Sequence, residues 1–176
     1  MGFDLYGENP VMREVNEDKY PIYNKYAGMT FNEREEIFKE LKEDLEDKYW
    51  DEYKLRETEN PGIYFRSNVW WWRRMWCFCE TYCDNILTEE DIEHGHYNDM
   101  HLISEEKASA MAKRLQEKID DGTAAHYENE TKLAYEQCEK DKNGSPVDFD
   151  MNYPFTVNVL QEFILFCSES GGFTIG

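Results

Sequence analysis

The segment Asn68–Trp76, which reads Asn-Val-Trp-Trp-Trp-Arg-Arg-Met-Trp, constrains the fold of this chain more than any other. It holds four of the five tryptophans in the 176 residues. Neighbouring side chains on a helix lie about 100° apart, so three successive tryptophans cannot share one face. Trp72 and Trp76 are one helical turn apart, which predicts that both lie in the core. Trp70 and Trp71 must then face a second layer or solvent.

Charge sets this segment apart from the rest of the chain. The chain has 38 acidic and 19 basic residues, a net charge of −19. Residues 60–86 sum to +1, whereas residues 32–59 sum to −6 and residues 87–150 to −10. A strongly acidic chain repels nucleic acid and anionic membranes, so direct binding to either is not expected. The same charge favours a basic protein partner.

Composition predicts a folded cytoplasmic protein. Aromatic residues make up 15% of the chain, too many for a disordered acidic segment. No apolar run approaches the roughly 18 residues that cross a bilayer, and no secretory signal opens the sequence. Five cysteines without such a signal are typical of reduced thiols in a cytosol.

Periodicity and turn signals predict an α+β fold, predominantly helical, with five or six helices and a small two- or three-stranded sheet. The whole of residues 1–176 is expected to form a single domain. Residues 11–29 are expected to be an irregular loop. The predicted strands cover 2–6, 63–66 and the end of 170–175. The predicted helices cover 30–53, 68–86, a short turn after Thr88, 104–120, 123–143 and a last helix with Pro154 at its first position.

Local capping signals support several of these helices. Thr30 and Glu33 form a capping box, in which each side chain bonds the backbone of the other. Asn68, Thr88 and Ser104 are N-cap residues for the helices that follow them.

The tryptophan segment is also the main candidate for ligand binding. Exposed tryptophan beside arginine stacks on planar groups and binds anions, which suits a nucleotide, a phosphate or a single-stranded base. The alternative is that the tryptophans pack the core while the arginines pair with carboxylates. Burial of one large side chain contributes about 1.5–3 kcal/mol, which explains the enrichment without a ligand. The candidate ligand-binding residues are Arg66, Trp70, Trp71, Arg73 and Arg74.

Three of the four histidines lie in one short stretch, residues 93–101. Imidazole and carboxylate groups are zinc ligands, so His94, His96, Asp99 and His101 are candidate metal ligands. Their spacing matches no known zinc motif, and the side chains on either side of Gly95 should diverge. The alternative is a solvated loop. The sequence selects no catalytic residue and predicts no cofactor.

Cysteine clusters in the same region of the chain. Cys77, Cys79 and Cys83 offer three thiols, but the second cysteine pair of a zinc ribbon is absent from the sequence. Cys79 and Cys83 fall on the face predicted to be buried. Core packing is therefore the favoured interpretation.

Three motifs give the chain a family resemblance: an opening Gly-Phe-Asp-Leu-Tyr-Gly, the string Tyr64-Phe-Arg-Ser-Asn-Val-Trp-Trp-Trp-Arg73, and a closing Ser-Gly-Gly-Phe. The chain resembles a family of uncharacterised small proteins from bacteriophages and bacterial genomes. The resemblance implies a bacterial cytosol, which is the host cytoplasm if the protein is viral, and it implies no activity. It leaves out residues 11–58, which are expected to elaborate a smaller core.

Three functional hypotheses follow. The first is a non-catalytic acidic binding protein, a phage accessory factor whose acidic helices around 33–59 and 89–141 engage a basic host protein. The second is a nucleotide- or phosphate-binding protein or enzyme that uses the Arg/Trp segment. The third is a metal-dependent enzyme that uses the loop from His94 to His101.

Overall fold

The computed structural model describes residues 2–13, 19–40 and 44–176. Within these ranges the chain forms eight α-helices, one 3-10 helix and four strands, which confirms a mainly helical α+β fold. The predicted numbers of helices and strands are both too low. Backbone contacts divide the chain into two compact units, unit 1 (Met1–Val11 and Gly62–Gly176) and unit 2 (Met12–Pro61). The single domain predicted over residues 1–176 stays a prediction.

Unit 1 contains a four-stranded antiparallel sheet with strand order β2-β1-β4-β3. The three predicted strands all belong to this sheet, in which β1 pairs with both β2 and β4. One strand, β3, was not predicted. It is three residues long and forms by pairing with β4, where Ile103 lies opposite Phe173. The strands are β1 (Gly2–Gly7), β2 (Tyr64–Asn68), β3 (His101–Ile103) and β4 (Phe173–Ile175).

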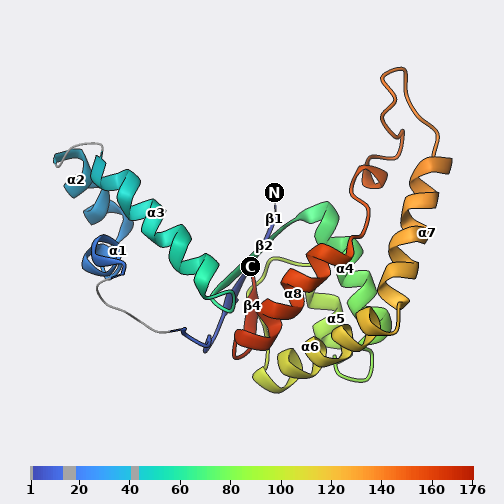
Figure 1. Cartoon of the computed structure of the whole chain (residues 1–176), viewed down its shortest axis with the longest axis horizontal. Helices are drawn as coiled ribbons and strands as arrows, with labels where there is room; N and C mark the ends of the chain where they lie inside the picture. Colours follow the sequence, from blue (N-terminus) through green and yellow to red (C-terminus); the bar gives the residue numbers. More distant parts are fainter. Residues whose placement is uncertain (1, 14–18, 41–43) are drawn as a thin grey trace. The chain divides into compact units, whose positions relative to one another are not determined.

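Within unit 1, helices pack against one face of this sheet (Figure 1). On the covered face, Phe3 and Leu5 of β1 are buried among residues of α4, α6 and α8. On the opposite face, Tyr6 is 47% exposed and Leu102 is 51% exposed. The helical elements of unit 1 are α4 (Val69–Tyr82), α5 (Glu89–His94), α6 (Glu105–Asp120), α7 (Thr123–Gln137), the 3-10 helix η1 (Phe149–Asn152) and α8 (Val157–Glu169).

The predicted caps of unit 1 are confirmed, but one predicted helix start is wrong. Asn68 accepts a hydrogen bond from the backbone N–H of Trp70 at 2.9 Å, and Thr88 and Ser104 also cap their helices. Pro154 does not begin α8, which starts three residues later at Val157. Thr156 caps this helix through the N–H of Val159, at 3.4 Å. The hydroxyl cap therefore sets the start of the helix, and the proline precedes it.

Unit 2 is a small helical unit with an aromatic core of Tyr26, Phe38 and Tyr49. It contains α1 (Pro21–Tyr26), α2 (Phe31–Glu40) and α3 (Asp44–Glu59).

One prediction about unit 2 needs correction. The irregular loop predicted at residues 11–29 contains α1, because Pro21 occupies the first turn, where its missing N–H costs nothing. The helix predicted over 30–53 corresponds to α2 and α3, and residues 41–43 lie outside the described part. The capping box at Thr30 is confirmed, because Thr30 donates to the Glu33 carboxylate at 2.8 Å.

Among the described residues, no helix combines the length and apolar character needed to cross a membrane.

Candidate functional site

The tryptophan string divides between two sides of α4. Trp72 and Trp76 are fully buried and stacked on each other, with ring centroids 5.2 Å apart. Their indole N–H groups donate to the backbone carbonyls of Gly95 at 2.7 Å and of Ile92 at 3.1 Å. The prediction that both lie in the core is confirmed. In addition, these two hydrogen bonds fix the end of α5, where the segment from His94 to His101 begins. We call this segment the histidine loop.

Gly95 shows how closely this loop approaches α4. A Cβ atom at this position would lie 1.9 Å from the ring of Trp76. Glycine is therefore required here by the contact itself, since its φ of −61° suits any residue.

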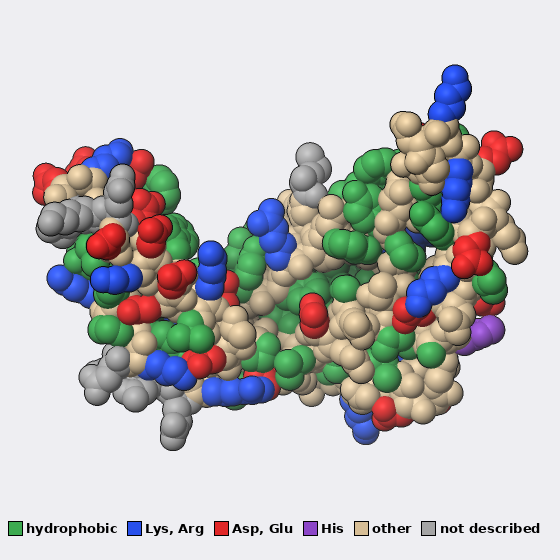
Figure 2. All heavy atoms as spheres, turned by 45° about the horizontal axis from the view of Figure 1, so that its top comes forward, with side chains coloured by type: hydrophobic (Ala, Val, Ile, Leu, Met, Phe, Trp, Pro, Cys, Tyr) green, Lys and Arg blue, Asp and Glu red, His purple; other side chains and the backbone are tan. Residues whose placement is uncertain are grey.

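Trp70 and Trp71 pack on the other side of α4, against Phe149 and Tyr153 from the region of η1. The ring of Trp71 lies perpendicular to that of Tyr153 at 5.4 Å, and Trp70 meets Phe149 edge-on at 5.2 Å. We call Trp70, Trp71, Phe149 and Tyr153 the aromatic cluster. Trp71 is 42% exposed and Phe149 is 53% exposed, so the cluster is open to solvent. Figure 2 shows the hydrophobic side chains that gather on this face of unit 1.

One of the three candidate arginines contacts the aromatic cluster, and a second lies beside η1. The guanidinium carbon of Arg73 lies 5.0 Å from the ring centroid of Trp70, a cation–π contact. Arg74 lines a recess of about 30 Å³ together with Asp150 and Pro154. Arg66 does not join them. It lies on β2 and pairs with Asp4 of β1 at 3.5 Å.

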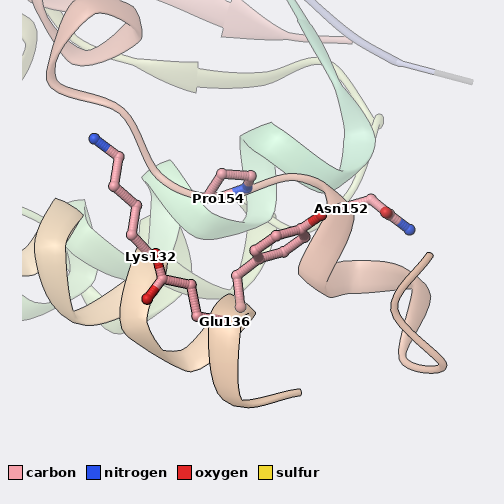
Figure 3. Close-up of a pocket in the computed structure, with 5 residues that line it drawn as sticks. Lys132, Glu136, Asn152 and Pro154 are labelled. Atoms are coloured by element: carbon pink, nitrogen blue, oxygen red, sulfur yellow. The ribbon is translucent and has the colours of Figure 1, made fainter. Parts of the chain in front are cut away.

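A groove of about 300 Å³ lies between α7 and the segment that follows η1. Lys132 and Glu136 line it from α7, while Asn152 and Pro154 line it from the other side (Figure 3). Lys132 is paired with Glu128 at 2.6 Å, which neutralises its charge. The groove shares Pro154 with the recess of Arg74, so the two hollows adjoin each other.

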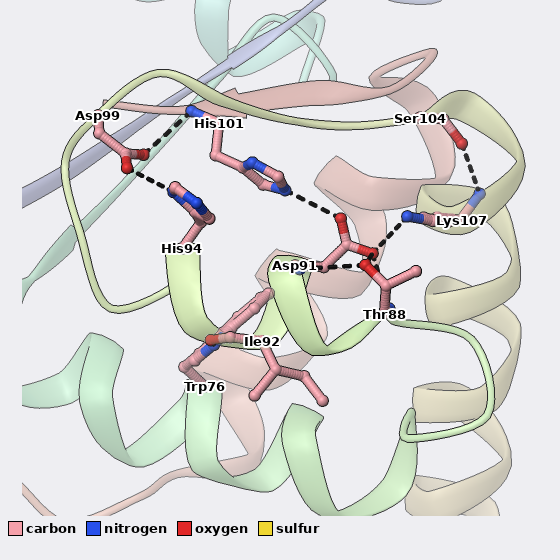
Figure 4. Close-up of polar contacts among 9 residues, drawn as sticks. All are labelled: Trp76, Thr88, Asp91, Ile92, His94, Asp99, His101, Ser104 and Lys107. Carbon is pink, nitrogen blue, oxygen red and sulfur yellow. Dashed lines mark hydrogen bonds and ion pairs between the residues drawn. The ribbon is translucent and has the colours of Figure 1, made fainter.

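A second candidate site surrounds the buried carboxylate of Asp91, which is 2% exposed (Figure 4). This carboxylate accepts hydrogen bonds from the backbone and hydroxyl of Thr88, each at 2.8 Å, from His101 Nε2 at 2.9 Å, and from Lys107. Burial by itself would raise the pKa of Asp91. The hydrogen bonds from Lys107, His101 and Thr88 outweigh burial and hold this pKa well below its usual range. Asp91 therefore stays ionised and joins α5, β3 and α6.

The histidines of this loop do not all come together. His94 and His101 stack with ring centroids 4.6 Å apart and planes 13° apart. His94 Nδ1 also contacts the carboxylate of Asp99, which raises the pKa of His94 and lowers that of Asp99. His96 turns away and pairs with Glu80 at 2.5 Å. The predicted divergence of His94 and His96 is confirmed.

The cysteines do not form part of either site. Cys79 and Cys83 are fully buried, as predicted, and burial raises the pKa of both thiols. A buried thiol with a raised pKa is a poor nucleophile and a poor ligand. Cys77 is exposed as a residue. Its sulfur is nevertheless partly shielded from solvent, and this partial burial raises the pKa of the Cys77 thiol.

Sequence reasoning missed several members of both sites. The partners of the aromatic cluster, Phe149 and Tyr153, lie more than 70 residues from the tryptophans and carry no signal of that contact. Glu90 lies close to His94 and His101, and it did carry a signal, because it precedes His94 by one helical turn. No protein-family model, curated protein or solved structure matches the chain. The geometry of the two sites therefore carries the functional inference.

Proposed function

We propose that this protein is a non-catalytic binding protein whose partner is a basic protein segment, and that the aromatic cluster is the contact surface. One observation carries the proposal: Trp71 and Phe149 are 42% and 53% exposed within one contiguous cluster. Exposed aromatic patches mark interaction sites, and tryptophan and tyrosine dominate the binding energy of protein interfaces.

The charge of the chain supports a basic partner. A net charge of −19 attracts cationic segments and accelerates their association. Asp148 and Asp150 lie in and beside η1, within the same short segment as Phe149. Arg73 already places a guanidinium over Trp70, so rings of this cluster accept such a group. An arginine or lysine of the partner would bind in the same manner to the open face of Trp71.

The resemblance to bacteriophage and bacterial proteins supports a biological setting for this partner. In that setting the chain is an accessory factor, and its partner is a basic protein of the bacterial host. Proteins that bind nucleic acid are rich in lysine and arginine, so they fit the required chemistry.

A nucleotide or phosphate ligand is the second candidate. It is favoured by Arg73, which lies over the ring of Trp70, and by Arg74, which lines a recess beside η1. The net charge of the chain opposes it, because a polyanion is repelled by an acidic protein.

Fluorescence anisotropy with labelled short peptides tests the proposal. We expect Arg- and Leu-rich peptides to bind, Glu- and Leu-rich peptides not to bind, and added salt to weaken the complex. Trp71→Ala should weaken binding about tenfold or more, a loss of about 1.4 kcal/mol. Trp50→Ala is the matched control, since Trp50 is 37% exposed in unit 2.

Two results would count against a basic partner. The first is that no basic peptide binds at low salt, and the second is that Trp50→Ala weakens binding as much as Trp71→Ala does. ATP binding that is lost in Arg73→Ala would instead support the second candidate.

A further inference from the structure

Glu90, His94 and His101 bring three potential metal ligands to one point at the boundary of α5 and β3. One ligand atom from each of these side chains lies within 4.8 Å of the other two. Glu90 and His94 are one turn apart on α5, so they project from the same face of the helix. His101 comes from the adjacent strand β3.

Each imidazole is already held by a carboxylate through one ring nitrogen. His94 Nδ1 contacts Asp99, and His101 Nε2 contacts Asp91 (Figure 4). Metal-bound histidines almost always have such a partner, which fixes the tautomer and makes the second nitrogen more basic. The arrangement therefore leaves His94 Nε2 and His101 Nδ1 as the nitrogens available to an ion.

The scaffold beneath these ligands is well packed. Trp76 bonds the carbonyl of Ile92 in α5, and Trp72 bonds that of Gly95, which follows it. Lys107 of α6 holds the carboxylate of Asp91, which orients His101. Ligands on a helix and a paired strand are placed more precisely than ligands on a loop.

The two rings must change their mutual angle to share an ion. Their planes are only 13° apart, whereas a bound ion lies in the plane of each ligating imidazole. Ion binding therefore turns one ring out of the stack. His94 is the freer of the two, because its side chain is 35% exposed and that of His101 is 15% exposed. Asp99 is itself exposed, so its carboxylate has room to follow His94.

We propose that Glu90, His94 and His101 form a binding site for a divalent transition metal ion, with zinc as the ion that this ligand set suits best. Two imidazoles and one carboxylate are a zinc ligand set that leaves the fourth position for water. Asp91 and Asp99 are positioning residues, since they act on the ion through the histidines. The site is separate from the aromatic cluster and does not depend on the function proposed for it.

Calorimetric titration of the untagged, metal-free chain with ZnCl₂ tests the site. We expect one zinc ion per chain, and we expect His94→Ala and His101→Ala to weaken binding at least about tenfold. Asp99→Asn should weaken it less than His94→Ala, within the roughly 10- to 100-fold range of such positioning residues. His96→Ala is the matched control, because His96 belongs to the same loop but pairs with Glu80.

His94→Ala is the decisive variant, because His101 supports the buried Asp91 and the loss of the His101 side chain is expected to lower stability as well.

Imidazole ¹H–¹⁵N spectra provide a second readout. On zinc addition, the ring signals of His94 and His101 should move, while that of His96 should not. The absence of saturable zinc binding, or equal losses in His94→Ala and His96→Ala, would overturn the proposal.

Discussion

Tryptophan lies on both sides of α4, buried in the core on one side and exposed to solvent on the other. Trp72 and Trp76 are fully buried, and their indole N–H groups bond the carbonyls of Gly95, which follows α5, and of Ile92 in α5. Trp71, one residue from Trp72, is 42% exposed and contacts Tyr153 edge-on. A buried tryptophan is stabilising when its polar N–H finds a partner, and the inner pair meets that condition. On the outer side of α4, by contrast, the ring of Trp71 stays partly exposed to solvent.

This difference shows that an aromatic string is not a functional motif as a whole. The inner tryptophans stabilise the fold and position the histidine loop. The outer tryptophans join residues from η1 to make a surface. Each side of α4 thus predicts a different response to mutation.

The largest effect is expected on the inner side. Trp76→Ala removes a fully buried ring and leaves the carbonyl of Ile92 without its donor. We expect the free energy of unfolding to fall by about 3–5 kcal/mol. Urea denaturation followed by circular dichroism measures this change. A loss below about 1 kcal/mol, the size of an ordinary mutation, would contradict the structural role of the inner pair.

The next largest effect is expected at Asp91, which the inner pair helps to place. Asp91→Asn removes a buried charge and weakens bonds from Lys107 and His101, so we expect a loss of about 2–3 kcal/mol at neutral pH. The pKa of Asp91 is lower in the folded state than its unfolded value of about 3.9. Its contribution is therefore complete above that value and is lost as the pH falls below it. Denaturation curves at neutral and acidic pH should show the difference between variant and wild type shrinking in acid. An equal difference at both pH values would contradict the ionised state of Asp91.

The smallest effect on stability is expected on the outer side. Trp71→Ala removes a ring that is 42% exposed, and we expect the free energy of unfolding to change by no more than about 1 kcal/mol. The same denaturation experiment measures it. A loss as large as that of Trp76→Ala would show that the outer side also belongs to the core, and the comparison would fail.

The parts of the fold that the sequence predicted are those with local causes. The caps at Asn68, Thr88 and Ser104 each depend on a side chain and a backbone N–H within three residues. The burial of Trp72 and Trp76 follows from their spacing on one helix.

The parts that were missed have causes distant in the chain. β3 is a strand because it pairs with β4, and its three residues carry too short a pattern to indicate it. Phe149 joins Trp70 through a contact that spans η1 and α4. The ionised state of Asp91 depends on Lys107, which belongs to the next helix. None of these contacts leaves a trace in residue spacing.

The two candidate sites were predicted to different extents. Trp70, Trp71 and Arg73 come together at the aromatic cluster, whereas Arg74 of the same helix lines the recess beside η1. Arg66 was misplaced, since alternation on β2 and its pairing with Asp4 set its direction. In the histidine loop, Asp99 joins His94 and His101, whereas His96 turns to Glu80.

The most direct test of the difference between the two sides of α4 is the response of the five tryptophan indole N–H signals to a basic peptide. In a ¹H–¹⁵N spectrum, each signal reports on one ring. As an Arg- and Leu-rich peptide is added, the signals of Trp71 and Trp70 should move to saturation. The signals of Trp72 and Trp76 should stay in place, because both groups are buried and bonded to the carbonyls of Gly95 and Ile92. A peptide that binds while the signal of Trp71 stays unchanged would contradict the account.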